Sequence, residues 1–231
     1  MIPMRTGLGP AVTTALPPPA LDRLCTNVAA YYTAKLARHG AIPPGVDWSC
    51  LATEQLRFVQ LLRICEFAAP FSLNDVGCGY GALAAFLAER YPSADIDYLG
   101  FDLSSAMVQR ARRRHRGKSA TRFNVGRTSP RIADYSVASG IMNVKLDEPI
   151  EHWETYVRGI LTDMYRSSRR GFAVNFMAAP TPGAPPDQLY CPSPDQWARF
   201  CRGDLECAVD TLCDYGLREF TLLVRRQPAA E

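Results

Sequence analysis

The stretch SLNDVGCGYGALAAFLAERY, residues 72–91, constrains the fold more than any other part of this chain. A short apolar run ends at Asp75, and a helical pattern begins after three alternate glycines, Gly77, Gly79 and Gly81. Glycines let the backbone turn tightly and let a ligand approach without interference from a Cβ atom. The following helix points free N–H groups and a positive dipole end at that ligand. The stretch therefore predicts a strand, a ligand-binding turn and a helix.

A second acidic residue supports a nucleoside-binding interpretation of this turn. Asp102 ends the next predicted strand, where a carboxylate can accept hydrogen bonds from ribose hydroxyls. Residues 77–82 also fit the dinucleotide fingerprint G-x-G-x-x-A, with Asp102 21 residues after Gly81, so an NAD-dependent oxidoreductase is one alternative. Against it, Asp75 suits a ligand that carries an amino group or a cation. The residues needed for a separate catalytic domain are also missing.

The order of predicted elements indicates an α/β fold. Apolar spacing predicts helices over 20–38 and 51–68, after which strands and helices alternate. Two strand-like runs, 206–215 and 219–226, close the pattern with no helix between them. Strands separated by helices imply a parallel sheet, and a closing hairpin adds an antiparallel strand. The expected architecture is Rossmann-like: a seven-stranded, mostly parallel sheet with a C-terminal antiparallel β-hairpin and helices on both faces. The strands and helices predicted between these ends are strands 71–76, 95–102, 121–125, 134–141 and 171–178 and helices 80–91, 104–116, 151–168 and 194–202.

Composition narrows the class of protein. The chain has 47% hydrophobic and 21% charged residues and a formal charge of +3, ordinary values for a soluble globular protein. No run approaches the ~18–20 apolar residues of a membrane span, and the N-terminus lacks the apolar region of a signal peptide. We therefore expect a cytoplasmic protein. Eight cysteines contain no CxxC pair and are accompanied by only three histidines, so we expect reduced thiols and no metal site.

Two strings carry a resemblance to a known family. LNDVGCGYG followed by DYLGFDLSSAMVQRAR resembles motifs I and II of class I S-adenosylmethionine-dependent methyltransferases, over about residues 50–225. The family fold is a seven-stranded sheet that closes with an antiparallel hairpin. The resemblance implies a methyltransferase domain over 51–231, preceded by a flexible lead-in and helical lid over 1–50. It also implies S-adenosylmethionine as cofactor and S-adenosylhomocysteine as product.

The same resemblance implies roles for individual residues. Asp75 would face the methionine amino group, and Asp102 would bind the ribose hydroxyls. Arg57, on the helix before the first strand, could reach the methionine carboxylate. The other residues expected to bind cofactor are Gly77, Cys78, Gly79 and Gly81 of the turn, Leu103 and Met107 against the adenine, and Ser139 after the fourth strand. The chain departs from many relatives after the third strand, where Gly126-Arg127 replaces an acidic residue.

The methyl acceptor is expected to lie beside the segment ASGIMNVK, residues 138–145. This segment is not the Asn/Asp-Pro-Pro-aromatic motif that holds planar amines, which argues against adenine, cytosine and glutamine acceptors. The polar residues of the expected acceptor edge are Ser139, Asn143 and Asn175. The strings HGAIPPGVDW and ASGIMNVK resemble those of a group of bacterial small-molecule methyltransferases. The lid would add Tyr31, Tyr32, Trp48 and His39, the last as a general base, and Tyr190 could enter the pocket.

The expected function is methyl transfer to the oxygen or nitrogen of a small molecule, in bacterial specialised metabolism. Methyl transfer from a sulfonium is an in-line displacement that depends mainly on proximity and alignment. The basic run QRARRRHRGK, residues 109–118, keeps a nucleic-acid methyltransferase as an alternative. A non-catalytic protein that binds S-adenosylmethionine is a further alternative. We expect no membrane partner, and the oligomeric state stays open.

Overall fold

The structure is a computed structural model that describes residues 15–179 and 186–227. Residues 1–14 of the predicted lead-in and residues 180–185 of the proline-rich loop lie outside the described residues. The helices are α1 (Pro18–His39), α2 (Leu51–Leu61), α3 (Ala82–Arg90), α4 (Ser105–Arg114), α5 (Ile150–Arg166) and α6 (Pro194–Gly203). The strands are β1 (Phe71–Val76), β2 (Ile96–Asp102), β3 (Thr121–Val125), β4 (Ala133–Ala138), β5 (Ser168–Met177), β6 (Cys207–Leu212) and β7 (Glu219–Arg226).

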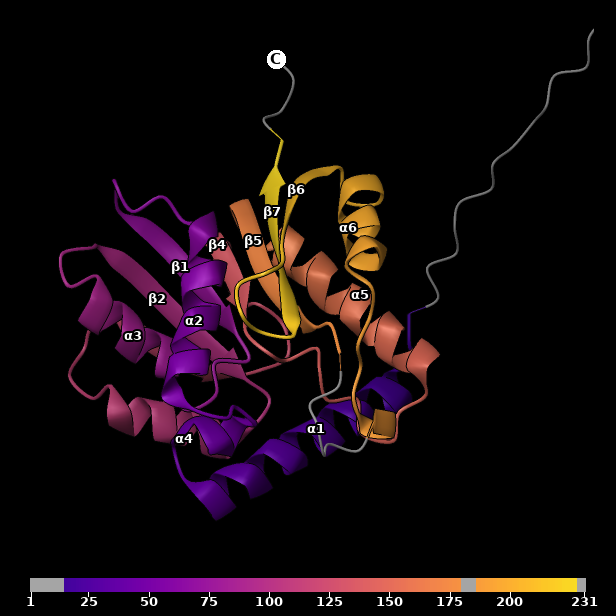
Figure 1. Cartoon of the computed structure of the whole chain (residues 1–231). Coiled ribbons are helices and arrows are strands. Elements are labelled where there is room, and N and C mark those ends of the chain that lie inside the picture. The colour runs from indigo at the N-terminus through magenta and orange to yellow at the C-terminus, as the bar shows by residue number, and fades with distance from the viewer. Residues whose placement is uncertain (1–14, 180–185, 228–231) are drawn as a thin grey trace, which may run out of the picture.

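The strands form one seven-stranded sheet in the order β3-β2-β1-β4-β5-β7-β6. The first five strands pair in parallel, whereas β7 runs antiparallel to both β5 and β6 (Figure 1). This arrangement confirms the predicted Rossmann-like fold, including its closing hairpin. The order in which successive strands are added reverses between β1 and β4, and such sheets bind ligands above the carboxyl ends of the strands at this point.

Alternate residues of each strand build a separate core on each face of the sheet. In β5, Phe172 and Val174 pack against the face covered by α5 and α6, while Ala173 faces the other core with α2, α3 and α4 (Figure 1). In β7, Leu222 and Leu223 divide in the same way. A strand covered on both faces reads as a continuous apolar run, which is why GFAVNFMA and EFTLLVRR carry so few polar residues.

Several elements differ from their predicted bounds by one to three residues, and two further differences have a clear structural description. The helix expected over 51–68 ends at Leu61 and continues only as a 3₁₀ turn, Leu62–Ile64. The strand expected over 134–141 ends at Ala138 because Gly140 adopts φ +76° and the chain turns away from the sheet. Residues 139–141 therefore form a loop above the sheet rather than its edge.

Helix α1 lies across the carboxyl edge of the sheet, below α4 in Figure 1. Ser104 caps α4 by accepting a hydrogen bond from the Met107 N–H at 3.2 Å, and its Oγ also lies 2.7 Å from Thr33 Oγ1 of α1. The 3₁₀ turn Pro43–Val46 (η1) is held to α1 because Asp47 pairs with Lys35 at 2.6 Å. These contacts place α1 and η1 as a cover over the ends of β1, β2 and β4.

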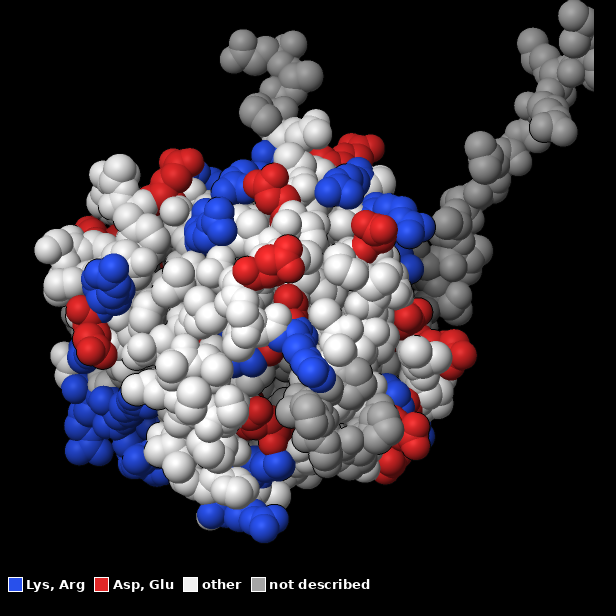
Figure 2. Space-filling view, viewed as in Figure 1, with Lys and Arg blue, Asp and Glu red and all other residues white. Residues whose placement is uncertain are grey.

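The basic run forms the C-terminal end of α4, where positive side chains interact favourably with the helix dipole. Figure 2 shows Lys and Arg side chains gathered over this helix. None of the described helices is long and apolar enough to cross a membrane. Within residues 15–179 and 186–227, no cluster of three metal-ligating side chains occurs.

Candidate active site

The glycine turn after β1 is held in a conformation that side chains rarely adopt. Gly77, Gly79 and Gly81 have φ values of +70°, +53° and +80°. The N–H groups of Gly77 and Cys78 donate to the carbonyl of Phe101 on β2, at 2.8 and 3.1 Å. A Cβ on Gly77 would lie 2.2 Å from Ile141 Cγ2. Glycine is therefore required here both by the backbone angles and by the close approach of the loop after β4.

Asp102 connects the glycine turn to the start of α4. Its Oδ2 accepts a hydrogen bond from the Gly79 N–H at 2.9 Å, and its Oδ1 accepts one from the Ser104 N–H at 2.8 Å. Burial raises the pKa of Asp102, while these two bonds act in the opposite direction. A carboxylate has about four acceptor sites, so Asp102 can also receive hydroxyl donors from a ligand.

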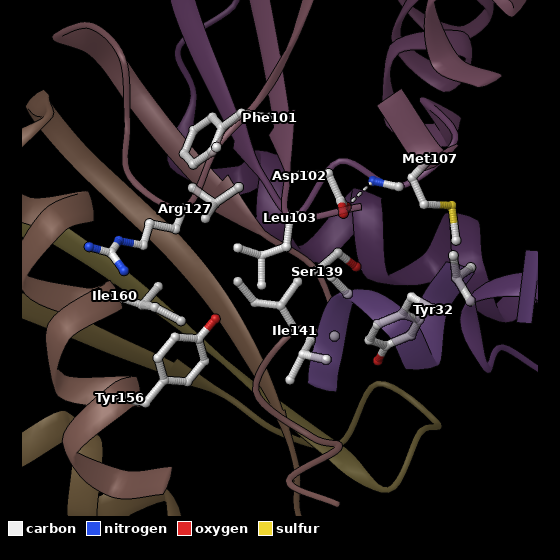
Figure 3. A pocket seen from close by; sticks show the side chains of 18 of the residues that line it. Tyr32, Phe101, Asp102, Leu103, Met107, Arg127, Ser139, Ile141, Tyr156 and Ile160 are labelled. Carbon is white, nitrogen blue, oxygen red and sulfur yellow. Dashed lines mark hydrogen bonds between the residues drawn. The ribbon is translucent and has the colours of Figure 1, made fainter. Parts of the chain in front are cut away.

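A cavity opens between α1, the glycine turn and the ends of β1, β2 and β4 (Figure 3). Asp102 and Ser139 supply polar atoms at its centre, and Leu103 and Ile141 present apolar side chains beside them (Figure 3). Such a mixture of a mainly apolar lining with a few polar groups is typical of small-molecule sites. The lining residues are Val28, Ala29, Tyr32, Val46, Trp48, Val76, Gly77, Gly79, Phe101, Asp102, Leu103, Met107, Gly126, Arg127, Ser139, Gly140, Ile141, Tyr156 and Ile160.

A smaller cavity lies on the α2–α3 side of the same turn. It contains two buried carboxylates, Glu54 and Asp75, each 3% exposed. Tyr98 donates its hydroxyl proton to Asp75 Oδ2, and Tyr80 donates to Glu54 Oε1 at 2.7 Å. Burial raises the pKa of Asp75 to about 7, and burial also raises the pKa of Glu54. This cavity therefore favours a ligand group that is positively charged.

The two cavities meet at a shared wall. Both are lined by Val46, Trp48, Gly77, Gly79 and Ser139. Ser139 Oγ is buried and has no hydrogen-bond partner among the residues that the structure describes. Because a buried polar atom without a partner is costly, this hydroxyl fits a site that a polar ligand completes. One elongated ligand could thus lie across the glycine turn, with a nucleoside end beside Asp102 and a cationic end beside Asp75.

Comparison with known proteins shows the family to which this chain belongs. Residues 74–171 match the sequence model of a family described as "Methyltransferase domain". The Mycobacterium tuberculosis protein named "Putative methyltransferase Rv1506c" is 40% identical over 166 residues, which cover 71% of this chain and 99% of that protein. This chain belongs to the class I S-adenosylmethionine-dependent methyltransferases.

Solved structures with the same fold include methyltransferases with bound ligand. The magnesium protoporphyrin IX methyltransferase of Synechocystis PCC 6803, solved with SAH, has a TM-score of 0.60 at 14% identity, covering 87% of this chain and 99% of that chain. The Haemonchus contortus phosphoethanolamine N-methyltransferase 1 has a TM-score of 0.66 at 10% identity, covering 91% of this chain and 50% of that chain. At these identities the likeness establishes the fold of this methyltransferase.

The structure brings most of the predicted cofactor residues of the methyltransferase together. All but Arg57 and Gly81 border one of the two cavities: Asp75, Gly77, Cys78, Gly79, Asp102, Leu103, Met107 and Ser139. Gly81 caps the N-terminus of α3 in a left-handed conformation and lines neither cavity. Its role is to end the turn.

The contacts of Arg57 differ from its predicted role of binding the methionine carboxylate. Its Nε donates to both carboxylate oxygens of Glu219 on β7, at 2.9 Å each, and its Nη1 donates to the Thr53 carbonyl at 2.8 Å. Arg57 is 7% exposed and borders neither cavity. Its positive charge is thus paired inside the protein, and the expected contact with a ligand carboxylate is replaced by this ion pair.

The predicted general base is also not at the site. His39 is the last residue of α1 and lies outside both cavities, because α1 directs its middle turns, rather than its end, toward the ligand space. Tyr32 and Trp48 line the larger cavity as expected. Tyr31 does not, since its hydroxyl donates to Asp47 Oδ2 at 2.9 Å and its ring packs edge-on against Tyr32.

Three further residues predicted to contact the acceptor have structural partners instead. Asn143 Oδ1 accepts the Met177 N–H at 2.9 Å, and Asn175 Oδ1 accepts the Gly140 N–H at 2.7 Å. The Tyr190 hydroxyl donates to Glu154 at 3.1 Å and accepts the Trp197 indole N–H at 3.1 Å. All three are at most 2% exposed and border neither cavity, so they fix loops behind the site.

Sequence reasoning missed Glu54 and Tyr156, which the fold places in the site. Glu54 lies one helical turn before Phe58, and both line the smaller cavity, so the i, i+4 spacing on α2 was the available signal. Tyr156 is next to Val157, one of the buried apolar residues of α5, and reaches the larger cavity (Figure 3). The arginine that replaces an acid after β3, Arg127, borders the larger cavity and pairs with Asp22 at 2.7 Å.

Proposed function

We propose that this methyltransferase holds S-adenosylmethionine across the glycine turn and transfers its methyl group to an oxygen or nitrogen of a small molecule, in bacterial specialised metabolism. The observation that carries the proposal is the pair of cavities that meet at Gly77 and Gly79, with Asp102 on one side and Asp75 on the other. Their spacing around one turn suits a ligand with a ribose at one end and an amino group at the other.

Each end of the site supplies matching chemistry. Asp102 accepts hydrogen bonds from the ribose hydroxyls. Leu103, Met107 and Ile141 offer apolar contacts to the adenine. Asp75 in its ionised form binds the amino group of the methionyl end, and the unpartnered Ser139 hydroxyl completes the polar contacts. The bound cofactor supplies a methyl group on a sulfonium. The protein contributes alignment, which accounts for much of the rate of such a displacement.

The groups that can accept a proton differ from the predicted histidine. Three carboxylates among the described residues line the two cavities, Asp75, Asp102 and Glu54, and burial raises the pKa of each. Burial raises the pKa of the Cys78 thiol well above its ordinary value, so this thiol stays protonated. Because Asp75 and Asp102 are assigned to the cofactor, Glu54 is the group we assign to the acceptor's proton.

A small acceptor is favoured by the cover over the site. Residues 15–50 contribute α1 and η1, and we propose them as the described part of a lid over residues 1–50, with the catalytic domain over 51–231. Val28, Ala29 and Tyr32 of α1 line the larger cavity directly. A covered, mostly apolar cavity selects a molecule that it can enclose.

The basic surface at the C-terminal end of α4 lies away from the larger cavity. Met107 in the first turn of α4 borders the larger cavity, whereas Arg112, Arg113 and Arg114 occupy the last turn of this 10-residue helix. With a rise of about 1.5 Å per residue, these arginines are roughly 8 to 10 Å farther along the axis. A nucleic acid on this patch would show steeply salt-dependent binding. We expect RNA binding to be absent at about 150 mM salt, the physiological range, in a filter-binding assay.

The direct test of the proposed function is a calorimetric titration with S-adenosylhomocysteine, with NADH as the control ligand. We expect saturable binding of the former alone, because Asp75 has no use at a pyrophosphate site. Once binding is measured, a thermal-shift screen of small phenols, carboxylic acids and amines in the presence of S-adenosylhomocysteine should reveal acceptors. Binding of NADH, or of neither ligand, would contradict the proposal.

A substitution at Gly79 tests where the cofactor lies. Gly79→Val should abolish S-adenosylhomocysteine binding, because Gly79 lines both cavities and a side chain there would fill their junction. Gly117→Val is the matched control, since Gly117 also has a positive φ of +84° but open space around its Cβ position. Both variants should lose stability from backbone strain, by ~1–2 kcal/mol. Equal cofactor affinity in the two variants would place the site elsewhere.

A further inference from the structure

Five residues that are distant in the sequence form a closed series of contacts behind the acceptor side of the site. They come from the segment before α2, from α2, from the loop after β4, from β5 and from β7. We call this set the buried ring; its members are Trp48, Arg57, Gly140, Asn175 and Glu219.

The polar half of the buried ring connects α2 to the loop after β4. Arg57 Nε donates to both carboxylate oxygens of Glu219 at 2.9 Å, and Asn175 Nδ2 donates to Glu219 Oε2 at 2.8 Å. Asn175 Oδ1 in turn accepts the Gly140 N–H at 2.7 Å. Arg57, Glu219 and Asn175 are 7%, 6% and 0% exposed as whole residues. Such a fully paired buried network holds its members in one geometry.

The aromatic half closes the ring. The Arg57 guanidinium carbon lies 3.7 Å from the ring centroid of Trp48, which is a close cation–π contact. On its far edge the indole touches the backbone of Gly140, since a Cβ on Gly140 would lie only 2.2 Å from Trp48 Cζ2. Trp48 is therefore held between the guanidinium and the glycine. Gly140 is held in turn by Asn175.

Only two members of the buried ring face the ligand space. Trp48 borders both cavities and Gly140 borders the larger one, whereas Arg57, Asn175 and Glu219 border neither. Ser139, with its unpartnered hydroxyl, directly precedes Gly140 and shares both cavities with Trp48. The ring thus fixes the surface at which the two cavities meet, without presenting its charges to a ligand.

We propose that Arg57, Asn175 and Glu219 are positioning residues for methyl transfer, which hold Trp48 and Gly140 as the wall that the acceptor contacts. The assignment of this wall to the acceptor rests on the proposed function. The residues act through others, so their loss should reduce turnover more than cofactor affinity. Cofactor contacts at Asp75 and Asp102 lie outside the ring and remain in place.

The position of Trp48 can be followed in the whole protein by acrylamide quenching of tryptophan fluorescence. Trp153 and Trp197 are 0% and 1% exposed, so the quencher reaches mainly Trp48, which is partly exposed. Trp48→Phe should remove the quenchable component and thereby verify the readout. In the parent protein, saturating S-adenosylhomocysteine should lower the quenching slope, because Trp48 borders both cavities.

The decisive variant is Arg57→Met/Glu219→Gln, which removes both charges and leaves neither partner buried alone. The amide that replaces the Glu219 carboxylate keeps an oxygen for Asn175. We expect a quenching slope at least twofold higher than in the parent, a Kd for S-adenosylhomocysteine within fivefold, and kcat at least tenfold lower with an acceptor from the screen. Arg57→Lys should also raise the slope, because lysine retains the charge but not the planar stacking surface. Gly140→Ala should displace Trp48 directly.

Asp134→Asn is the matched control for a merely structural effect. Asp134 accepts hydrogen bonds from the backbone and hydroxyl of Ser72 at the opposite end of the sheet, and its loss should lower stability without changing Trp48 quenching. An unchanged quenching slope in the double variant and in Arg57→Lys would overturn the positioning role. This readout needs no ligand, so it stands apart from the proposed function, which fails separately if the parent does not bind S-adenosylhomocysteine.

Discussion

Replacing Asp102 by alanine should weaken S-adenosylhomocysteine binding by roughly ten- to a hundredfold, since hydrogen bonds to a charged group contribute about 1.5–3 kcal/mol each. Two effects act together. The ribose hydroxyls lose their acceptor, and the N–H groups of Gly79 and Ser104 lose the carboxylate that joins the turn to α4. Calorimetry at one pH measures the change directly.

Two variants separate these effects for Asp102. Asp102→Asn keeps one acceptor oxygen and should bind with intermediate affinity. Asp97→Ala is the matched control, because Asp97 lies on the same strand but is exposed and pairs with Arg122 and Arg131. A parent-like Kd in Asp102→Ala would contradict the proposed ribose site, whereas a large loss in Asp97→Ala would indicate that the strand as a whole had been disturbed.

The second large effect concerns pH. Burial raises the pKa of Asp75 from 3.8 to about 7, so most of this carboxyl is protonated at about pH 6 in the free protein. If only the ionised form binds the cofactor's amino group, affinity is reduced by the fraction of competent protein, roughly tenfold at pH 6 relative to pH 8. Calorimetry in buffers of different ionisation enthalpy should also detect release of about one proton per ligand bound at pH 6.

The same shift affects the stability of the free protein. Since the folded-state pKa of Asp75 is raised, the unfolded chain loses this proton first, and the free energy of unfolding falls as pH rises from about 4 to about 7. Asp75→Asn should remove this loss and stabilise the protein at about pH 8, by up to a few kcal/mol at about 1.4 kcal/mol per pK unit. Thermal denaturation at about pH 5, within this range, and at about pH 8, above it, measures the difference.

The Asp75→Asn variant should also bind S-adenosylhomocysteine weakly, and its affinity should not depend on pH. Asp95→Asn, at an exposed position, is its control and should follow the parent in both assays. Affinity that rises with pH in Asp75→Asn as it does in the parent would show that another group titrates. A variant that is more stable but binds less well would show that the buried carboxyl is kept for binding.

Local sequence patterns predicted the strands well and the loops poorly. The run FSLNDV matches β1 residue for residue because its apolar residues and the glycine after it are both local signals. ASGI read as the end of a strand because Ile141 is apolar. Its departure from the sheet depends on the Gly140 backbone angle and on Asn175, a residue 35 positions away.

The site followed the same division. Asp75, Gly79 and Asp102 belong to two neighbouring local motifs, and the fold brings them together around the two cavities. Arg57 was correctly placed on a helix beside the first strand, but its availability depends on Glu219, 162 residues later. No spacing rule reveals that a distant carboxylate neutralises it. Charge pairing between a helix and a distant strand is tertiary information, and helical periodicity does not carry it.

The strand order has a consequence for how the enzyme is made. β7 is synthesised after β6 yet lies inside the sheet, between β5 and β6, and it carries Glu219. Until residues 219–226 have left the ribosome, β5 has a bare edge, β6 has no neighbour and Arg57 has no counter-charge. Pairing over such sequence separations is slow and leaves strand edges open to aggregation. Nascent chains of this enzyme that end before β7 should therefore depend on chaperones and lack a completely formed active site.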